Sequence, residues 1–345
     1  MTRLKTLPFL LSLLLCAACA TTDQGKGTAR KPSGVKITKD DKALSIKVNG
    51  DLFAVYNFAA DGAKRPFFYP VYGPSGKLTV RNWPMKEVPN EERDHPHHQG
   101  IWFGHREVNG MTFWDNNPAG GLQVHEKFVD VSSGKDYGQF TEKVRWDDKN
   151  GKEVCRDVRT ITILNRPEGY FMDFEITLFA TGGPLHFGDD KDGLMAIRVA
   201  ESMRLKIPKV WNDRKAGTQQ GQGHIVVSDG SRDESTWGKK GPWCDYYGPV
   251  DGETIGVAMF DHPDNLRHPT WWHVRDYGLF AANPFGKRHF ENLKDTKAGE
   301  FELPDGKSIT FKYRFYFHVG NEVQARVADH YADYVRETSV RLTSR

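Results

Sequence analysis

Two long runs of alternating apolar and polar residues constrain the fold more than any other feature of the sequence. Residues 170–178 place an aromatic or aliphatic side chain at every second position, and residues 309–317 do the same. Because successive side chains of a strand point to opposite faces, each run predicts a strand with one buried and one polar face. This pattern is typical of antiparallel sheets that pack face to face.

Shorter segments extend the pattern. Residues 44–48 and 52–56 alternate on either side of Asn49-Gly50, which predicts a hairpin with a tight primed turn. Further strands are expected at 67–72, 161–164, 224–227 and 255–259. One helix is expected at about 321–337, where Asn321 and Gln324 form a capping box. We therefore expect an all-β, mainly antiparallel fold, in which residues 36–345 form a single large β-sandwich or supersandwich with a C-terminal helix.

The N-terminus has the pattern of an export signal over residues 1–19. Basic residues precede an apolar run at 7–15 that is too short to span a membrane, and small residues follow. Lipidation at Cys19 and ordinary cleavage after Ala20 both fit, and we favour lipidation. Residues 20–35 are polar without apolar periodicity, which predicts a flexible tether. We expect an exported protein of the cell envelope or periplasm that meets the membrane only through its lipid anchor.

Composition excludes several classes of function. The 48 basic and 45 acidic residues nearly balance at a net charge of +3 with no basic block, so nucleic acid is not an expected partner. The chain has no dinucleotide-binding fingerprint, phosphate-binding loop or nucleophile elbow, so nucleotide-dependent chemistry is not expected either. Beyond the signal only Cys155 and Cys244 remain, and whether they pair stays open.

The densest group of chemically active side chains lies at residues 94–106. His95, His97, His98 and His105 fall within eleven residues there, among two glycines, a proline and two large aromatic residues. Neutral imidazole is the commonest metal ligand and also titrates nearest neutral pH. The cluster is therefore an acid–base site, a metal site or a hydrogen-bonded structural loop. As a strand, it would point His95 and His97 one way and His98 the other.

Two later polar segments carry further candidates. Residues 186–198 join an acidic loop to a strand, and residues 261–278 combine histidine, arginine and an aromatic pair. Arginine pairs with carboxylates in a bidentate manner, and exposed tryptophan stacks on sugar rings. The alternatives are that the tryptophans belong to the core, that the acidic loop is only a solvated turn, and that Arg275 only pairs with Asp276.

The sequence thus gives three sets of candidate residues. The candidate catalytic residues are His98, His105, Glu107, Asp190 and His262, the candidate substrate-binding residues are Arg81, Trp102, Asn109, Trp114, Arg198, Asn265, Trp272 and Arg275, and the candidate metal ligands are His95 and His98. No cofactor is required by any motif, and a divalent metal held by the two histidines and one distant histidine is the alternative.

Four motifs give the chain a family resemblance. They are Arg65-Pro66-Phe67-Phe68-Tyr69-Pro70, Asp94-His95-Pro96-His97-His98-Gln99-Gly100, Val108-Asn109-Gly110 with Phe113-Trp114, and Arg275-Asp276-Tyr277-Gly278 with Asn283-Pro284. From about Arg65 to Phe285 the chain resembles a bacterial family of uncharacterised proteins labelled "methane oxygenase PmoA" domain proteins. The label does not fit, because a particulate methane monooxygenase subunit lies in the membrane and this mature chain has no apolar run of spanning length.

The resemblance also carries expectations about fold and substrate. It implies export from glycan-degrading bacteria and a fold similar to the galactose-mutarotase supersandwich, but no settled catalytic residues. Our leading hypothesis is a carbohydrate-active enzyme, an epimerase, lyase or hydrolase, that acts on a sugar or oxidised glycoside by proton transfer between histidine and carboxylate. The alternatives are a glycan-binding lipoprotein without catalysis and a structural envelope protein.

Overall fold

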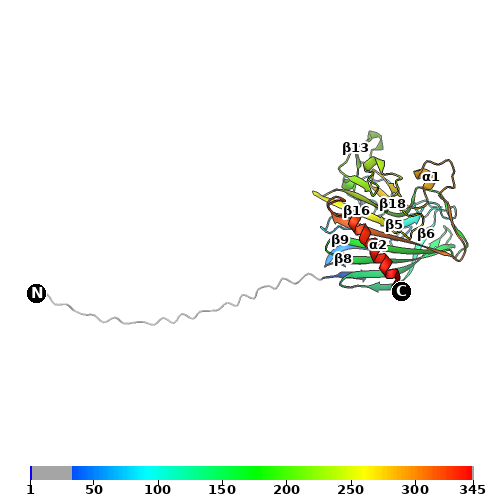
Figure 1. Cartoon of the computed structure of the whole chain (residues 1–345), viewed down its shortest axis with the longest axis horizontal. Coiled ribbons are helices and arrows are strands. Elements are labelled where there is room, and N and C mark those ends of the chain that lie inside the picture. The colour runs from blue at the N-terminus through cyan, green and yellow to red at the C-terminus, as the bar shows by residue number, and fades with distance from the viewer. Residues whose placement is uncertain (2–32, 344–345) are drawn as a thin grey trace. The chain divides into compact units, whose positions relative to one another are not determined.

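Two large antiparallel sheets form the body of the protein in the computed structural model, which describes Met1 and residues 33–343 (Figure 1). The first sheet has the spatial order β1-β2-β3-β4-β5-β11-β18-β17, and the second has the order β14-β15-β16-β20-β9-β8-β7-β6. The strands of the first sheet are β1 (Val35–Lys39), β2 (Ala43–Val48), β3 (Asp51–Asn57), β4 (Phe67–Val71), β5 (Ile101–His105), β11 (Gly193–Arg198), β17 (Trp271–Val274) and β18 (Leu279–Asn283). Those of the second sheet are β6 (Leu122–Ser132), β7 (Tyr137–Asp147), β8 (Glu153–Arg166), β9 (Gly169–Phe179), β14 (His224–Val227), β15 (Trp243–Val250), β16 (Glu253–Asp261) and β20 (Ser308–Val319). The expected all-β sandwich is confirmed.

Smaller elements decorate the two sheets. Strands β10 (Leu185–Phe187) and β19 (Phe301–Leu303) form one pair, and β12 (Lys206–Pro208) and β13 (Thr218–Gln220) form another. The helical elements are η1 (Glu201–Met203), η2 (Arg214–Ala216), η3 (Asp233–Ser235), α1 (Lys287–Phe290) and α2 (Val327–Thr343).

The predicted hairpin is present where the chain enters the first sheet. Strands β2 and β3 pair across Asn49 and Gly50, whose φ angles are 51° and 89°. A primed turn requires positive φ at both central residues, which asparagine and glycine adopt most easily. The turn chemistry therefore determines the register of this pair.

The main core lies between the sheets and follows from the alternation. Phe311, Phe315 and Phe317 of β20 are fully buried in it, and the Phe311 ring lies 6.3 Å from Phe103 of β5. On the opposite face of β20, the hydroxyls of Thr310 and Thr177 lie 2.8 Å apart. One face of each long strand is thus apolar and the other polar.

Helix α2 packs on the outer face of the second sheet, as Figure 1 shows. It begins at Val327, later than expected, although Asn321 and Gln324 do exchange capping hydrogen bonds of 3.0 and 2.9 Å. The reason is Arg326, whose φ of 53° interrupts the helical backbone. The capped segment is a turn that positions the helix.

The structure bears on the expectations for the N-terminal segment, the cysteines and membrane-spanning helices only in part. The predicted signal peptide and the tether up to residue 32 lie outside the described residues, and β1 already begins at Val35. Cys155 and Cys244 are both buried and free. Among the helices of residues 33–343, none is long and apolar enough to cross a membrane.

Candidate functional site

The candidate site lies on the outer face of the first sheet. Strand pairing places Phe67, Trp102, Ala196 and Ala281 in one row across β4, β5, β11 and β18. These residues belong to an apolar cluster separate from the main core. Because the two alanines are small, loops from distant parts of the chain can approach the sheet closely here.

Asp94 is the centre of a charge network over this floor. Its carboxylate accepts hydrogen bonds from Arg81, from Nη2 of Arg198 at 3.2 Å and from Nδ1 of His95 at 2.7 Å. Its side chain is 7% exposed, and both guanidinium groups are fully buried. Burial alone would raise the pKa of Asp94, but His95, Arg198 and Arg81 together hold it well below its usual range. Asp94 is therefore a fixed negative charge at neutral pH.

Further buried ion pairs support this network from below. The guanidinium of Arg204 donates to Glu92 and to Glu201, each at 2.8 Å. The other carboxylate oxygen of Glu201 lies 3.9 Å from Arg81 and 3.5 Å from Arg198. Buried ions gain little net stability from such pairs, but losing one partner is costly, so the network fixes the segment 91–100, which we call the histidine loop.

His95 is the imidazole best placed for chemistry. Its ring is stacked with Tyr277 at 5.2 Å and with His98 at 4.8 Å, with interplanar angles of 2° and 7°. Since Nδ1 donates to Asp94, the tautomer leaves Nε2 as the atom for exchange with a ligand. The side chain is 33% exposed. Its φ of 40° is rare for a residue with a side chain and is held by the surrounding contacts.

His98 lies deeper and has a different role. Nη1 of Arg198 donates to its Nδ1 at 3.1 Å, and the ring stacks on Trp102 at 5.1 Å. Burial, followed by the charge of Arg198, holds the pKa of His98 well below its usual value. The neutral ring connects the charge network to the apolar floor.

His97 faces a second set of charged groups. Arg65 donates to its backbone carbonyl at 3.2 Å, and burial together with Arg65 lowers the pKa of the imidazole to about 4. Asp115 and Asp192 act in the opposite direction without reversing the shift. His97 is therefore neutral at neutral pH and half-buried.

Asp192 is the second carboxylate of the site. Nη1 of Arg106 donates to it at 3.1 Å, and Nδ1 of His273 lies 3.7 Å away. Burial raises the pKa of Tyr277, Arg198 and Arg275 act to lower it, and Asp192 and Asp94 raise it. Tyr277 thus lies within the electrostatic field of both carboxylates.

Access to Asp94 comes from a pocket of about 550 Å³. It is lined by Glu92, Arg93 and Asp94 of the histidine loop and by residues 212–215 of the β12–β13 connection. Arg214 is mostly exposed and its Nη2 lies 3.8 Å from Asp94. A polar ligand can therefore approach Asp94 from solvent through this pocket.

The structure brings only some of the predicted residues together. Arg81, His95, His98, Arg198 and Arg275 converge on the site from four separate segments of the chain. His95 and His98 stack face to face instead of pointing in opposite directions, because the loop forms a turn and the strand begins only at Ile101.

Other candidates near the loop lie elsewhere. His105 is fully buried against Phe187 and Phe285 and donates from Nε2 to the Gly188 carbonyl at 2.9 Å, and burial lowers its pKa. Glu107 is exposed and packs over Gly188, and Asn109 bridges the backbone of residues 184 and 186. Asp190 lies 3.8 Å from Arg106, at the edge of the site.

The candidates of residues 261–272 belong to the structural framework. His262 packs on Tyr334 of α2, and Asn265 bonds Asp261 and the backbone of Lys312. The predicted tryptophans Trp102, Trp114 and Trp272 are buried, at 2%, 1% and 0% exposure. They therefore present no ring face to a sugar, since their apolar area fills the interior.

The metal alternative finds no geometric support. Parallel stacked rings direct their lone pairs side by side, and Nδ1 of each ring already faces Asp94 or Arg198. Within residues 33–343, no group of three or more histidine, cysteine, aspartate or glutamate side chains could hold a metal ion.

Three residues of the site escaped sequence reasoning as individual chemical groups. Asp94 and Tyr277 were visible only as parts of motifs, and His97 stood beside the chosen candidates of the histidine cluster, whereas Asp192 was already a candidate of the acidic loop.

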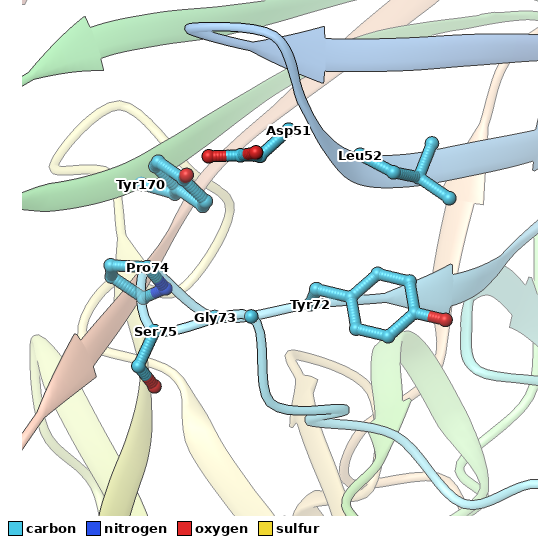
Figure 2. Close-up of a pocket in the computed structure, with 8 residues that line it drawn as sticks. Asp51, Leu52, Tyr72, Gly73, Pro74, Ser75 and Tyr170 are labelled. Atoms are coloured by element: carbon cyan, nitrogen blue, oxygen red, sulfur yellow. The ribbon is translucent and has the colours of Figure 1, made fainter.

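A separate pocket of about 480 Å³ lies at the β2–β3 turn (Figure 2). Asp51, Leu52, Tyr72 and Tyr170 line it with the turn 73–76, and Figure 2 shows the Asp51 carboxylate directed toward Tyr170. None of the candidate catalytic, substrate-binding or metal-binding residues lines this pocket.

A family model covers most of the chain. It matches residues 43–332 and is described as "Family of unknown function (DUF6807)". The chain belongs to this family. The match includes every residue of the site, whereas the comparison with curated proteins finds no match. No comparison supports the methane-oxygenase label of the family resemblance.

Solved structures similar to this family member include sugar enzymes. The galactosidase domain of alpha-galactosidase-sucrose kinase has a TM-score of 0.42 at 7% identity, over 83% of this chain and 42% of that one. Galactose 1-epimerase from Lactobacillus acidophilus NCFM has a TM-score of 0.38 at 8% identity, and the match covers 85% of this chain and 100% of that one. A galactose mutarotase-like protein from Lactobacillus casei ATCC 334 has a TM-score of 0.32 at 10% identity, and the match covers 83% of this chain and 100% of that one. The chain therefore spans less than half of the galactosidase.

Proposed function

We propose that this protein is an exported, lipid-anchored carbohydrate-active enzyme that moves a proton on a sugar or oxidised glycoside. The observation that carries the proposal is the Asp94–His95 pair, in which a carboxylate oxygen lies 2.7 Å from Nδ1 and the imidazole side chain is 33% exposed. A carboxylate behind Nδ1 fixes the tautomer and stabilises the imidazolium that forms when Nε2 takes a proton.

The surroundings of His95 support this role. Tyr277 and His98 hold the ring by stacking, so little reorganisation is needed when a ligand arrives. The fixed charges of Arg81 and Arg198 hold Asp94 in place as an anion. The ring of His97, which is neutral at pH 7, lies 5.6 Å from that of His95 and adds a polar group to the same loop.

The chemistry follows from these groups. Nε2 of His95 would remove a proton from a sugar hydroxyl or from a carbon beside a carbonyl, and a second group would return one elsewhere. Epimerisation and elimination begin with such a transfer, whereas in hydrolysis Nε2 would remove a proton from the attacking water and a second group would protonate the leaving oxygen. Nothing in the residue set requires a metal ion, and the proposal routes no step through one.

The test replaces the imidazole without disturbing the backbone. His95→Asn suits a residue with positive φ, because asparagine tolerates this conformation. We expect turnover to fall at least about a hundredfold, the typical contribution of a general base. The control is His224→Gln, an exposed histidine on β14 that should leave turnover unchanged.

Three assays cover the three reaction classes on a panel of aldoses, uronides and aryl glycosides. They follow anomer exchange by NMR, formation of an unsaturated product by ultraviolet absorbance and release of the aryl group. Turnover by His95→Asn at the wild-type rate would contradict the proposal. Sugar binding without turnover in any assay would instead favour the glycan-binding lipoprotein.

A further inference from the structure

The clearest unexplained side chain of the site is Arg275. Every other arginine between residues 33 and 336 has a guanidinium that contacts a carboxylate, a carbonyl or a histidine, as Arg106 does with Asp192. Among the described residues, the guanidinium of Arg275 has no hydrogen bond or ion pair. The local pair with Asp276 that the sequence allowed is not formed.

Arg275 is nevertheless held in position. Its guanidinium carbon lies 5.5 Å from the centre of the Tyr277 ring and 6.0 Å from that of Trp237. The backbone N–H of Arg275 donates to Leu279 at 2.7 Å, which fixes the base of the side chain at the end of β17. An arginine stacked on two rings loses little freedom when it binds a ligand, since its planar fork is already oriented.

The acids around Arg275 form no ion pair with it. Arg275 lines a pocket of about 270 Å³ with Asp233, Glu234 and Asp276. Asp233 accepts from the backbone N–H of Ile225 at 3.0 Å, and Glu234 pairs with Lys206 at 3.4 Å. Although three carboxylates share the pocket, none of them lies within ion-pair distance of the Arg275 guanidinium.

Tyr277 connects Arg275 to the reaction centre. Its ring stacks on His95 and also contacts Arg198, whose guanidinium carbon lies 4.8 Å from the ring centre. His95 and Arg275 therefore both contact the ring of Tyr277.

We infer that the substrate is an acidic sugar, whose carboxylate or sulfate group pairs with Arg275. This inference rests on the proposed function and narrows it to one substrate class. Two parallel N–H groups of arginine match the two oxygens of a carboxylate, which neutral sugars lack. Arg275 would then select the ligand, while His95 would act on it.

The test measures binding of matched sugars to the full chain by calorimetry. The probes are D-galactose, D-galacturonate and D-galactose 6-sulfate, with D-glucose and D-glucuronate as a second pair. We expect the acidic sugar of a pair to bind at least about tenfold more tightly than its neutral partner, because a hydrogen bond to a charged group contributes about that factor to affinity. The uronate and the sulfate ester report separately, so they distinguish the two anionic groups.

Variants then assign the preference to one residue. Arg275→Met keeps the apolar stem and should abolish the preference while changing neutral-sugar affinity by less than about twofold. Arg275→Lys keeps the charge and should restore part of the preference. Arg326→Met, on an exposed arginine of the segment before α2, is the matched control and should leave the preference intact.

The outcomes separate the two proposals. Equal binding of acidic and neutral sugars by the wild type, or an unchanged preference in a folded Arg275→Met variant, would overturn the inference and leave the proposed function standing. No binding of any probe would contradict the proposed function and the inference together.

Discussion

Asp94→Asn tests whether one carboxylate holds the site together. The substitution keeps the shape of the side chain but removes the charge that faces Arg81 and Arg198, both fully buried. Removing one partner of a buried ion pair typically costs about 3–5 kcal/mol, because the remaining charge stays desolvated. Since the asparagine oxygen can still accept a hydrogen bond and Glu201 still offers a charge at 3.5 Å from Arg198, we expect the lower end, about 3 kcal/mol.

Urea unfolding at pH 7, followed by tryptophan fluorescence, measures this cost directly. The matched control is Asp61→Asn, where an exposed carboxylate meets Lys42 at the surface and no measurable change is expected. A cost for Asp94→Asn that equals that of the control would refute the reasoning, because it would mean that the arginines do not depend on Asp94.

The same pair of proteins gives a pH dependence of defined sign. The folded pKa of Asp94 is lowered, so its stabilisation is fully present above the unfolded pKa of about 3.9 and is lost as pH falls toward the folded value. The free-energy difference between wild type and Asp94→Asn should therefore be constant from pH 7 to about 5. It should shrink only below about pH 4.

Two further predictions concern the floor and the stack. Gly100→Ala should prevent folding or lower the free energy of unfolding by several kcal/mol. The Cβ of the alanine would lie 1.8 Å from the Phe68 carbonyl oxygen, and the backbone φ of 57° favours glycine. Thermal unfolding of the variant at the wild-type temperature would contradict this. Tyr277→Phe should keep the stack on His95 and most turnover, whereas Tyr277→Ala should lose turnover at least tenfold, since an aromatic pair contributes about 0.5–1.5 kcal/mol and also orients the ring. Equal activity of the two variants would show that the stack does not position His95.

The fold was largely predictable because its signals are local. Alternation in residues 170–178 and 309–317 sets which face each strand buries, and Asn49-Gly50 sets a turn that only positive φ allows. The helix was predicted correctly in kind but not in its start, because the positive φ of Arg326 lies inside a pattern that reads as helical.

The site was predictable in its location but not in its roles. The sequence by itself showed that residues 94–106 gather imidazoles, and it named Arg81, Arg198 and Arg275 among the candidate substrate-binding residues. It assigned His98 and His105 the acid–base role, whereas the structure buries both and gives the exposed position to His95. Only the pairing of β5 with β11 and of β11 with β18 brings Arg198 and Tyr277 to the histidine loop. These contacts join segments about a hundred or more residues apart, and no local periodicity encodes which imidazole then faces solvent.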